Sequence, residues 1–133
     1  MSGEFQRVEA RAAVATQDMR TKQYRALRAS AAGECQIASN AVLAPGEIIG
    51  VLQNKPNSGQ NATVGYAGVS KVYCGSTVTA NRMITIQASG QATNAASGDY
   101  AFGFALGAGV SGEVVSALLF QPALQLTTNS FSA

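Results

Sequence analysis

Side chains that carry most acid–base chemistry in proteins are scarce in this chain. Histidine, the commonest general base and metal ligand, is absent. The seven carboxylates are scattered along the sequence, and Glu47 and Asp99 occupy equivalent places in two similar stretches. Acids placed in that way accept turn amides rather than face each other. The residues therefore predict no enzyme, and they predict no cofactor or metal site.

One stretch has the letters of a nucleotide-binding motif. Residues 107–112 read GAGVSG, which matches G-x-G-x-x-G. The phosphate-binding version requires a helix to begin there and an acidic residue about twenty positions later. Residues 113–119 are instead typical of a strand, and no acidic residue follows Glu113. A hairpin turn is the better interpretation.

The two cysteines, Cys35 and Cys74, are weak candidates for nucleophiles. A reactive thiol needs a basic neighbour to lower its pKa, and only Lys71 is near Cys74 in the sequence. The first residues lack the apolar core of a secretory signal, so we expect synthesis in the cytoplasm and two free, partly buried thiols. One disulfide between the two is the alternative. No stretch has the length of a transmembrane helix, so we expect no membrane association.

Charge is distributed unevenly along the chain. Residues 1–34 hold six cations and four acids, whereas the remaining 99 residues hold three of each. The net charge of +2 does not point to nucleic acid, and the basic run from Arg20 to Arg28 contains Tyr24 as its one aromatic residue. Docking onto an acidic protein surface is the functional interpretation of this run, and a solvated edge is the alternative.

The elements that must position these residues come from a repeat. Residues 46–64 and 98–115 share a glycine and an acid, an apolar run with one internal glycine, a Ser-Gly pair and a second apolar run. Strands separated by glycine-rich turns at intervals of roughly ten residues are typical of a small sandwich or barrel. We predict a mainly β fold, a small β-sandwich or barrel built from two similar strand-turn-strand units. Its β domain spans residues 22–122, with pseudo-repeats at about 22–74 and 78–122.

The two ends of the chain differ from this domain. Residues 1–21 are charged and almost free of glycine, and we expect an extended N-terminal arm docked on a neighbouring molecule. A short helix over Val8 to Ala15 and a solvated terminus are the alternatives. Residues 123–133 form a C-terminal tail that adds an edge strand or lies on a neighbour.

A set of short motifs, in this order and spacing, resembles the small capsid cement, or decoration, proteins of tailed bacteriophages. The most distinctive part is Gly50-Val51-Leu52-Gln53-Asn54-Lys55-Pro56, followed by Gly68-Val69-Ser70-Lys71-Val72. The other matching segments are Asp18-Met19-Arg20 through Tyr24, Ser58-Gly59, Gly98-Asp99-Tyr100, Gly103-Phe104-Ala105-Leu106 and Gly112-Glu113-Val114-Val115. The resemblance covers roughly residues 17–122.

The resemblance implies a structural protein on the outer capsid surface of the virion. Such proteins bind the expanded phage head, bridge neighbouring subunits of the major capsid protein and stabilise the shell against internal DNA pressure. They commonly assemble as trimers or dimers; we expect a homotrimer, with a homodimer as the alternative. The expected partners are thus the major capsid protein and further copies of this chain, with no nucleic acid and no membrane.

The residue-level hypothesis for capsid binding combines one apolar anchor with several cations that would meet carboxylates. These residues are Phe5, Arg7, Arg11, Arg20 and Lys22. A β-rich tail or fibre component is the closest rival, because it too would be oligomeric. A carbohydrate-binding adhesin would instead cluster exposed aromatic residues on one face, and the five Phe and four Tyr are dispersed.

Overall fold

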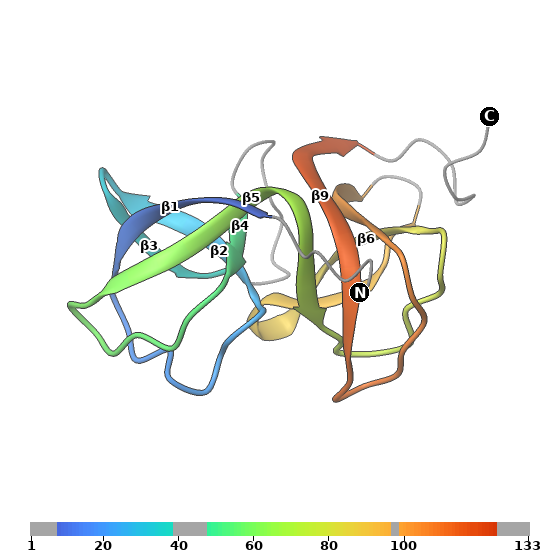
Figure 1. Cartoon of the computed structure of the whole chain (residues 1–133), viewed down its shortest axis with the longest axis horizontal. Helices are drawn as coiled ribbons and strands as arrows, with labels where there is room; N and C mark the ends of the chain where they lie inside the picture. Colours follow the sequence, from blue (N-terminus) through green and yellow to red (C-terminus); the bar gives the residue numbers. More distant parts are fainter. Residues whose placement is uncertain (1–7, 39–47, 97–98, 125–133) are drawn as a thin grey trace.

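The computed structural model describes residues 8–38, 48–96 and 99–124, apart from the side chains of residues 121–124. Almost all regular structure in this part is β (Figure 1). The elements are β1 (Val8–Ala15), β2 (Ala26–Ala31), β3 (Glu34–Ile37), β4 (Ile48–Leu52), β5 (Asn61–Tyr73), β6 (Met83–Gln87), the short 3-10 turn η1 (Ala88–Gly90), β7 (Gln91–Asn94), β8 (Tyr100–Ala105) and β9 (Val114–Leu124). The predicted mainly β fold is confirmed.

The order of the strands in the sheet has the same pattern on either side of its centre. The order is β1-β3-β2-β4-β5-β9-β8-β6-β7, and β5 and β9 are neighbours at the centre. Moving outward from β5 the strands are β4, β2 and β3, and moving outward from β9 they are β8, β6 and β7. Every neighbouring pair within these two series is antiparallel. Each predicted repeat thus contains one copy of the same four-strand unit.

In the first half, β1 closes the sheet into a five-stranded barrel. It lies parallel to β3, with Val14 opposite Glu34, and antiparallel to β5, from Val14 opposite Asn61 to Val8 opposite Gly68. This first barrel (β1, β3, β2, β4 and the beginning of β5) is on the left of Figure 1. Closure removes the exposed edges that β3 and β5 would otherwise present.

In the second half, the end of β5 takes the place of β1. Cys74, directly after β5, forms a parallel bridge with Ala92 of β7, and the Gly75 N–H donates to the Ala92 carbonyl at 2.9 Å. The corresponding bond of the first barrel runs from the Thr16 N–H to the Cys35 carbonyl at 3.0 Å. We call this ring (the end of β5 with β6 to β9) the second barrel. Strand β5 therefore belongs to both barrels.

The equivalence extends to the turns between the last two strands of each half. In the first half, Gln60 Oε1 accepts the Asn57 N–H at 2.7 Å; in the second, Glu113 Oε1 accepts the Val110 N–H at 3.0 Å. The second turn contains the G-x-G-x-x-G letters at residues 107–112, and it joins antiparallel strands β8 and β9. The hairpin interpretation of that motif is confirmed.

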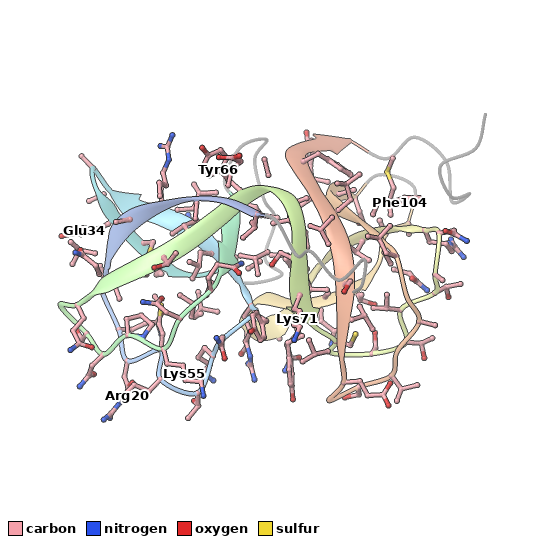
Figure 2. The ribbon with its side chains drawn as sticks, in the orientation of Figure 1. Arg20, Glu34, Lys55, Tyr66, Lys71 and Phe104 are labelled. Carbon is pink, nitrogen blue, oxygen red and sulfur yellow. The ribbon has the colours of Figure 1, made fainter. Side chains whose placement is uncertain are left out.

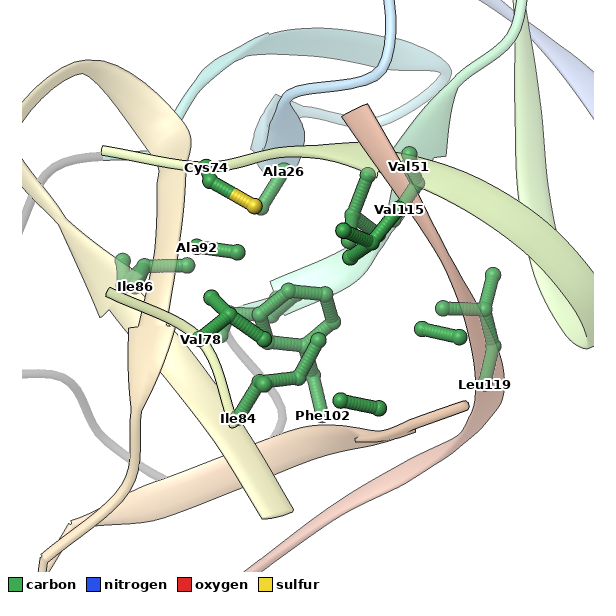
Figure 3. Packing of buried hydrophobic residues seen from close by; sticks show 14 of the residues in the cluster. Ala26, Val51, Cys74, Val78, Ile84, Ile86, Ala92, Phe102, Val115 and Leu119 are labelled. Atoms are coloured by element: carbon green, nitrogen blue, oxygen red, sulfur yellow. The ribbon is translucent and has the colours of Figure 1, made fainter. Parts of the chain in front are cut away.

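The apolar cores of the two barrels correspond position by position. The first core is made of Ala15, Met19, Leu27, Cys35, Leu52, Ala62 and Val64. Their equivalents are Cys74, Val78, Ile84, Ala92, Ala105, Val115 and Ala117, all in the second core. That second cluster also reaches into the first half: in Figure 3 Ala26 lies near Cys74, and Val51 lies near Val115. Burial of these side chains joins the two barrels into one body.

The predicted arm over residues 1–21 needs a correction. Residues 8–15 are strand β1, and neither an arm outside the domain nor a helix. The sequence did not predict this strand because it is rich in alanine, whose side chain marks neither an apolar nor a polar face clearly. Ala15 is nevertheless fully buried in the first core. Residues 1–7 lie outside the described residues. The first two residues of the predicted tail continue β9, and residues 125–133 also lie outside the described residues.

The internal glycine of each apolar run lets two strands approach closely. A Cβ on Gly50 would collide with the Gly65 carbonyl oxygen and would lie 2.6 Å from Val64 Cγ1. A Cβ on the equivalent Gly103 would lie 3.1 Å from the Leu118 carbonyl oxygen. Gly50 also has a φ of +155°. The repeated glycine is thus a steric requirement of the fold.

Replacing Gly50 with alanine should therefore lower the free energy of unfolding by about 2 kcal/mol or more, through overpacking and backbone strain. The matched control is Gly33→Ala, at a position with φ +76° and nothing within 4 Å of the new Cβ, where a loss of about 1 kcal/mol is expected. Urea unfolding of both variants measures the difference. Equal losses would contradict the steric explanation.

Candidate partner-binding surface

The structure separates the residues predicted to bind the capsid. Phe5 and Arg7 lie outside the described residues. Arg11 is exposed on β1, and its guanidinium carbon lies 5.3 Å from the centre of the Tyr66 ring. Arg20 and Lys22 are in the loop after β1. Figure 2 shows Tyr66 and Arg20 at opposite margins of the first barrel, so Arg11 does not join the other two cations.

Arg11 lines a shallow groove of about 560 Å³ on the first barrel. Its other lining residues are Ala12, Ala13, Ala29, Ala31, Gly33, Glu34, Ile49 and Tyr66. Most of the lining is methyl groups and backbone, with one cation and one carboxylate. These groups suit contact with a partner's surface and assemble no nucleophile and base.

Arg20 already has a partner in its own loop. Its Nε and Nη2 donate to the Asp18 carboxylate, both at 2.9 Å, and its backbone N–H donates to Asp18 Oδ1 at 3.0 Å. The side-chain bond from Arg20 is the main reason why the pKa of Asp18 falls from 3.8 to about 2. The same pairing raises the pKa of Arg20. A partner's carboxylate would have to compete with Asp18 for this arginine.

The third cation of the basic run, Arg25, joins the two halves of the molecule. Its guanidinium carbon lies 4.6 Å from the centre of the Tyr73 ring, at the end of β5. Its Nη1 also donates to the Ser89 carbonyl in η1, at 3.4 Å. This half-buried side chain is therefore part of the contact between the barrels, which the sequence pattern did not reveal.

The cysteines are confirmed as free thiols. Cys35 and Cys74 are both fully buried, in the first and the second core respectively. Burial raises the pKa of both thiols, and the charge of Glu113 raises that of Cys74 further. Thiols of this kind are protonated and unreactive at neutral pH.

The described residues contain no group of three or more His, Cys, Asp or Glu side chains placed to hold a metal ion. No helix in the same part of the chain is long and apolar enough to cross a membrane.

Four loops reach the lower margin of the molecule in Figure 1, and we call them together the loop edge. They comprise residues 16–25, 53–60, 75–82 and 106–113. Within each half the two loops are hydrogen-bonded: the Met19 N–H donates to the Pro56 carbonyl at 2.9 Å, and the Val78 N–H to the Gly109 carbonyl at 2.8 Å. Arg20, Lys22 and Lys55 are on this edge. Sequence reasoning had left Lys55 and the second pair of loops out of the candidate surface.

A solved structure has a similar fold. It is the crystal structure of the N base of the head fibre gp8.5 in bacteriophage phi29, with a TM-score of 0.64 and 20% sequence identity. The similarity covers 90% of this chain and 99% of that chain. At this identity the comparison shows a shared fold over almost the whole length of both chains. No protein-family profile matches the sequence, and no curated protein matches it.

The Asp18–Arg20 pair gives a pH-dependent prediction. The pKa of Asp18 is lowered to about 2 in the folded protein. The pair therefore contributes fully to stability above pH 3.8, and this contribution is lost as the pH falls toward 2. Titration of the Asp18 carboxyl carbon by NMR should show a midpoint of about 2, and Arg20→Gln should return it toward 3.8. A wild-type midpoint near 3.8 would show that the pair does not form in solution.

The Arg25–Tyr73 contact should have a measurable coupling energy. In a double-mutant cycle with Arg25→Ala and Tyr73→Leu, we expect a coupling energy of about 1 kcal/mol, because the stacked guanidinium is partly desolvated. Arg11→Ala with Tyr66→Leu is the control cycle, since that pair is more exposed. Its guanidinium carbon also lies farther from the ring centre, at 5.3 Å compared with 4.6 Å for Arg25 and Tyr73. A control coupling as large as that of Arg25 would mean that burial at the barrel junction adds nothing.

Proposed function

We propose that this chain is a structural protein of a bacteriophage head and binds the outer surface of the expanded capsid. The observation that carries the proposal is the fold, which the chain shares over 90% of its length with the base of a phage head fibre. The resemblance of residues 17–122 to capsid cement proteins supports the same location.

The chemistry of the described residues supports a structural and not an enzymatic role. The chain has no histidine, its cysteines are buried with raised pKa values, and no three of its described carboxylates and thiols are placed to hold a metal ion. A duplicated body poor in charge suits close packing against other proteins.

The specific role that we propose is that of a cement protein. It bridges neighbouring subunits of the major capsid protein and strengthens the shell against internal DNA pressure. Each copy would then contact more than one capsid subunit, and the chain would act as a homo-oligomer, with three-fold symmetry favoured over two-fold.

A second candidate is the base of a head fibre, and the structural similarity is the observation behind it. The similarity covers 99% of the solved N base of such a fibre. In this role the fold anchors a fibre to the head and contributes little to the strength of the shell. The two roles share capsid binding and differ in stabilisation.

Co-sedimentation with expanded, empty capsids of a phage that encodes the chain tests the shared part. Full-length protein should pellet saturably with capsids. A variant lacking residues 1–7 tests the predicted contribution of Phe5 and Arg7. The truncation must stop there, because removal of residues 8–15 would delete β1 and open the first barrel. Absence of binding by the full-length chain would refute the proposal.

Heating of capsids with and without bound protein separates the two roles. A cement protein should raise the temperature at which the capsids rupture, whereas a fibre base should bind at saturation and leave that temperature unchanged. Calorimetry of saturated and bare capsids gives the comparison.

A further inference from the structure

The two copies of the hairpin loop differ at the positions that face solvent. In the second half, Leu106 and Val110 of the loop and Val114, the adjoining first residue of β9, are 47%, 54% and 44% exposed. Their equivalents in the first half are Gln53, Asn57 and Asn61, as the matching turn bonds and strand registers show. Three aliphatic side chains of the second half thus occupy exposed positions where the first half has amides. Of these amides, Asn61 is exposed, whereas Asn57 and Gln53 are half-buried and Gln53 Nε2 donates to Ser70 Oγ at 2.8 Å.

The duplication itself shows that folding does not require these aliphatic residues. The same turn forms in the first half with polar residues at the three positions. It includes the equivalent internal bond, in which Gln60 Oε1 accepts the Asn57 N–H as Glu113 Oε1 accepts the Val110 N–H. Exposed aliphatic groups gathered in one place cost solubility and mark contact sites. Their presence in the second half therefore points to a partner.

Positive charge is concentrated on the same edge. The four loops of the loop edge hold five cations and two acids, a net charge of +3. The rest of the sequence holds four cations and five acids, a net charge of −1. Of the five cations, Arg20 is paired with Asp18 and Arg25 stacks on Tyr73. Lys55 is exposed and Lys22 is half-buried. Figure 2 shows Lys55 beside the same margin as Arg20.

We propose that the loop edge is the docking surface of this protein, and that it binds a protein surface that carries carboxylates next to an apolar patch. The basic loops of the first half would meet the carboxylates, and the aliphatic loop of the second half would meet the apolar patch. This inference rests on the proposed function, and it identifies which face of the molecule contacts the shell.

The chemistry of the edge favours a protein over a nucleic acid as the partner. Binding to single strands uses aromatic side chains on which bases stack, and Tyr24, which is half-buried, is the one aromatic residue in the four loops. Branched aliphatic side chains gain their binding energy by displacing water from another apolar surface. A basic margin beside that surface speeds and orients association.

The test exchanges four of the five residues for those that the equivalent positions already accept, and it replaces Lys22 with an uncharged glutamine. The first variant is Leu106→Gln with Val110→Asn and Val114→Asn, which copies residues 53, 57 and 61. The second is Lys22→Gln with Lys55→Ala, where alanine is the residue at the equivalent position 108. The matched control is Leu118→Asn, which removes an aliphatic side chain of similar exposure (43%) on β9, outside the loop edge. Circular dichroism and thermal melts verify folding of each variant.

Binding to expanded capsids is then measured by co-sedimentation between low and high salt. The first variant should lose at least tenfold in affinity, and the control should bind within twofold of wild type. The second variant should bind several-fold more weakly at low salt and should show a smaller dependence on salt, because two charge contacts are gone.

The outcomes separate this inference from the proposed function. If wild type binds capsids and both loop-edge variants bind equally well, the inference is wrong and the capsid role stands. If wild type does not bind, the proposed function fails and the inference fails with it.

A labelled single-stranded oligonucleotide that binds wild type but not the lysine variant would make the edge a nucleic-acid site. Loss of self-association by the aliphatic variant in sedimentation velocity would make it an interface between copies. Both of these last results would overturn the proposal.

Discussion

The fold depends on one strand that satisfies hydrogen bonds in two barrels at once. The first part of β5 pairs with β1 and β4, and its last part pairs with β9. The change occurs at Gly68, which is opposite Val8 on one side and Leu119 on the other and has a φ of +95°. Glycine adopts this backbone conformation without steric cost, and Figure 1 shows β5 arching over the molecule from the first barrel to the second. Neither barrel is complete without its share of β5.

The repeat was predictable because glycine has a local steric meaning. Gly50 and Gly103 recur since each allows a close approach of strands, and this requirement is visible in one sequence. The strand at residues 8–15 was not predictable, because alanine fits both a buried and an exposed position and leaves no alternation to detect. The ring closure by Cys74 and Ala92 was hidden for a different reason: its partners are far apart in sequence and small.

The candidate surface was predictable only in part. The sequence shows where the charged side chains are along the chain, but it does not show which of them are paired within the protein. Arg20, Lys22 and Arg25 are close together along the chain, yet Arg20 is paired with Asp18 and Arg25 stacks on Tyr73 in the junction between the barrels. The sequence predicted a hairpin turn at residues 107–112, but it did not show that Leu106, Val110 and Val114 are exposed. Their exposure became meaningful once the polar loop of the first half could be placed beside them.

The pairing of β1 with β5 also determines the order in which the chain can fold during synthesis. Val14 pairs with Asn61 and Val8 with Gly68, so β1 must wait for its last partner until roughly sixty residues of chain have followed it from the ribosome. By then β2, β3 and β4 have already emerged, and the first barrel can close as a unit. All five strands of the first barrel precede β6 to β9 along the chain. The first barrel can therefore close while the second still lacks β9, the last strand to leave the ribosome.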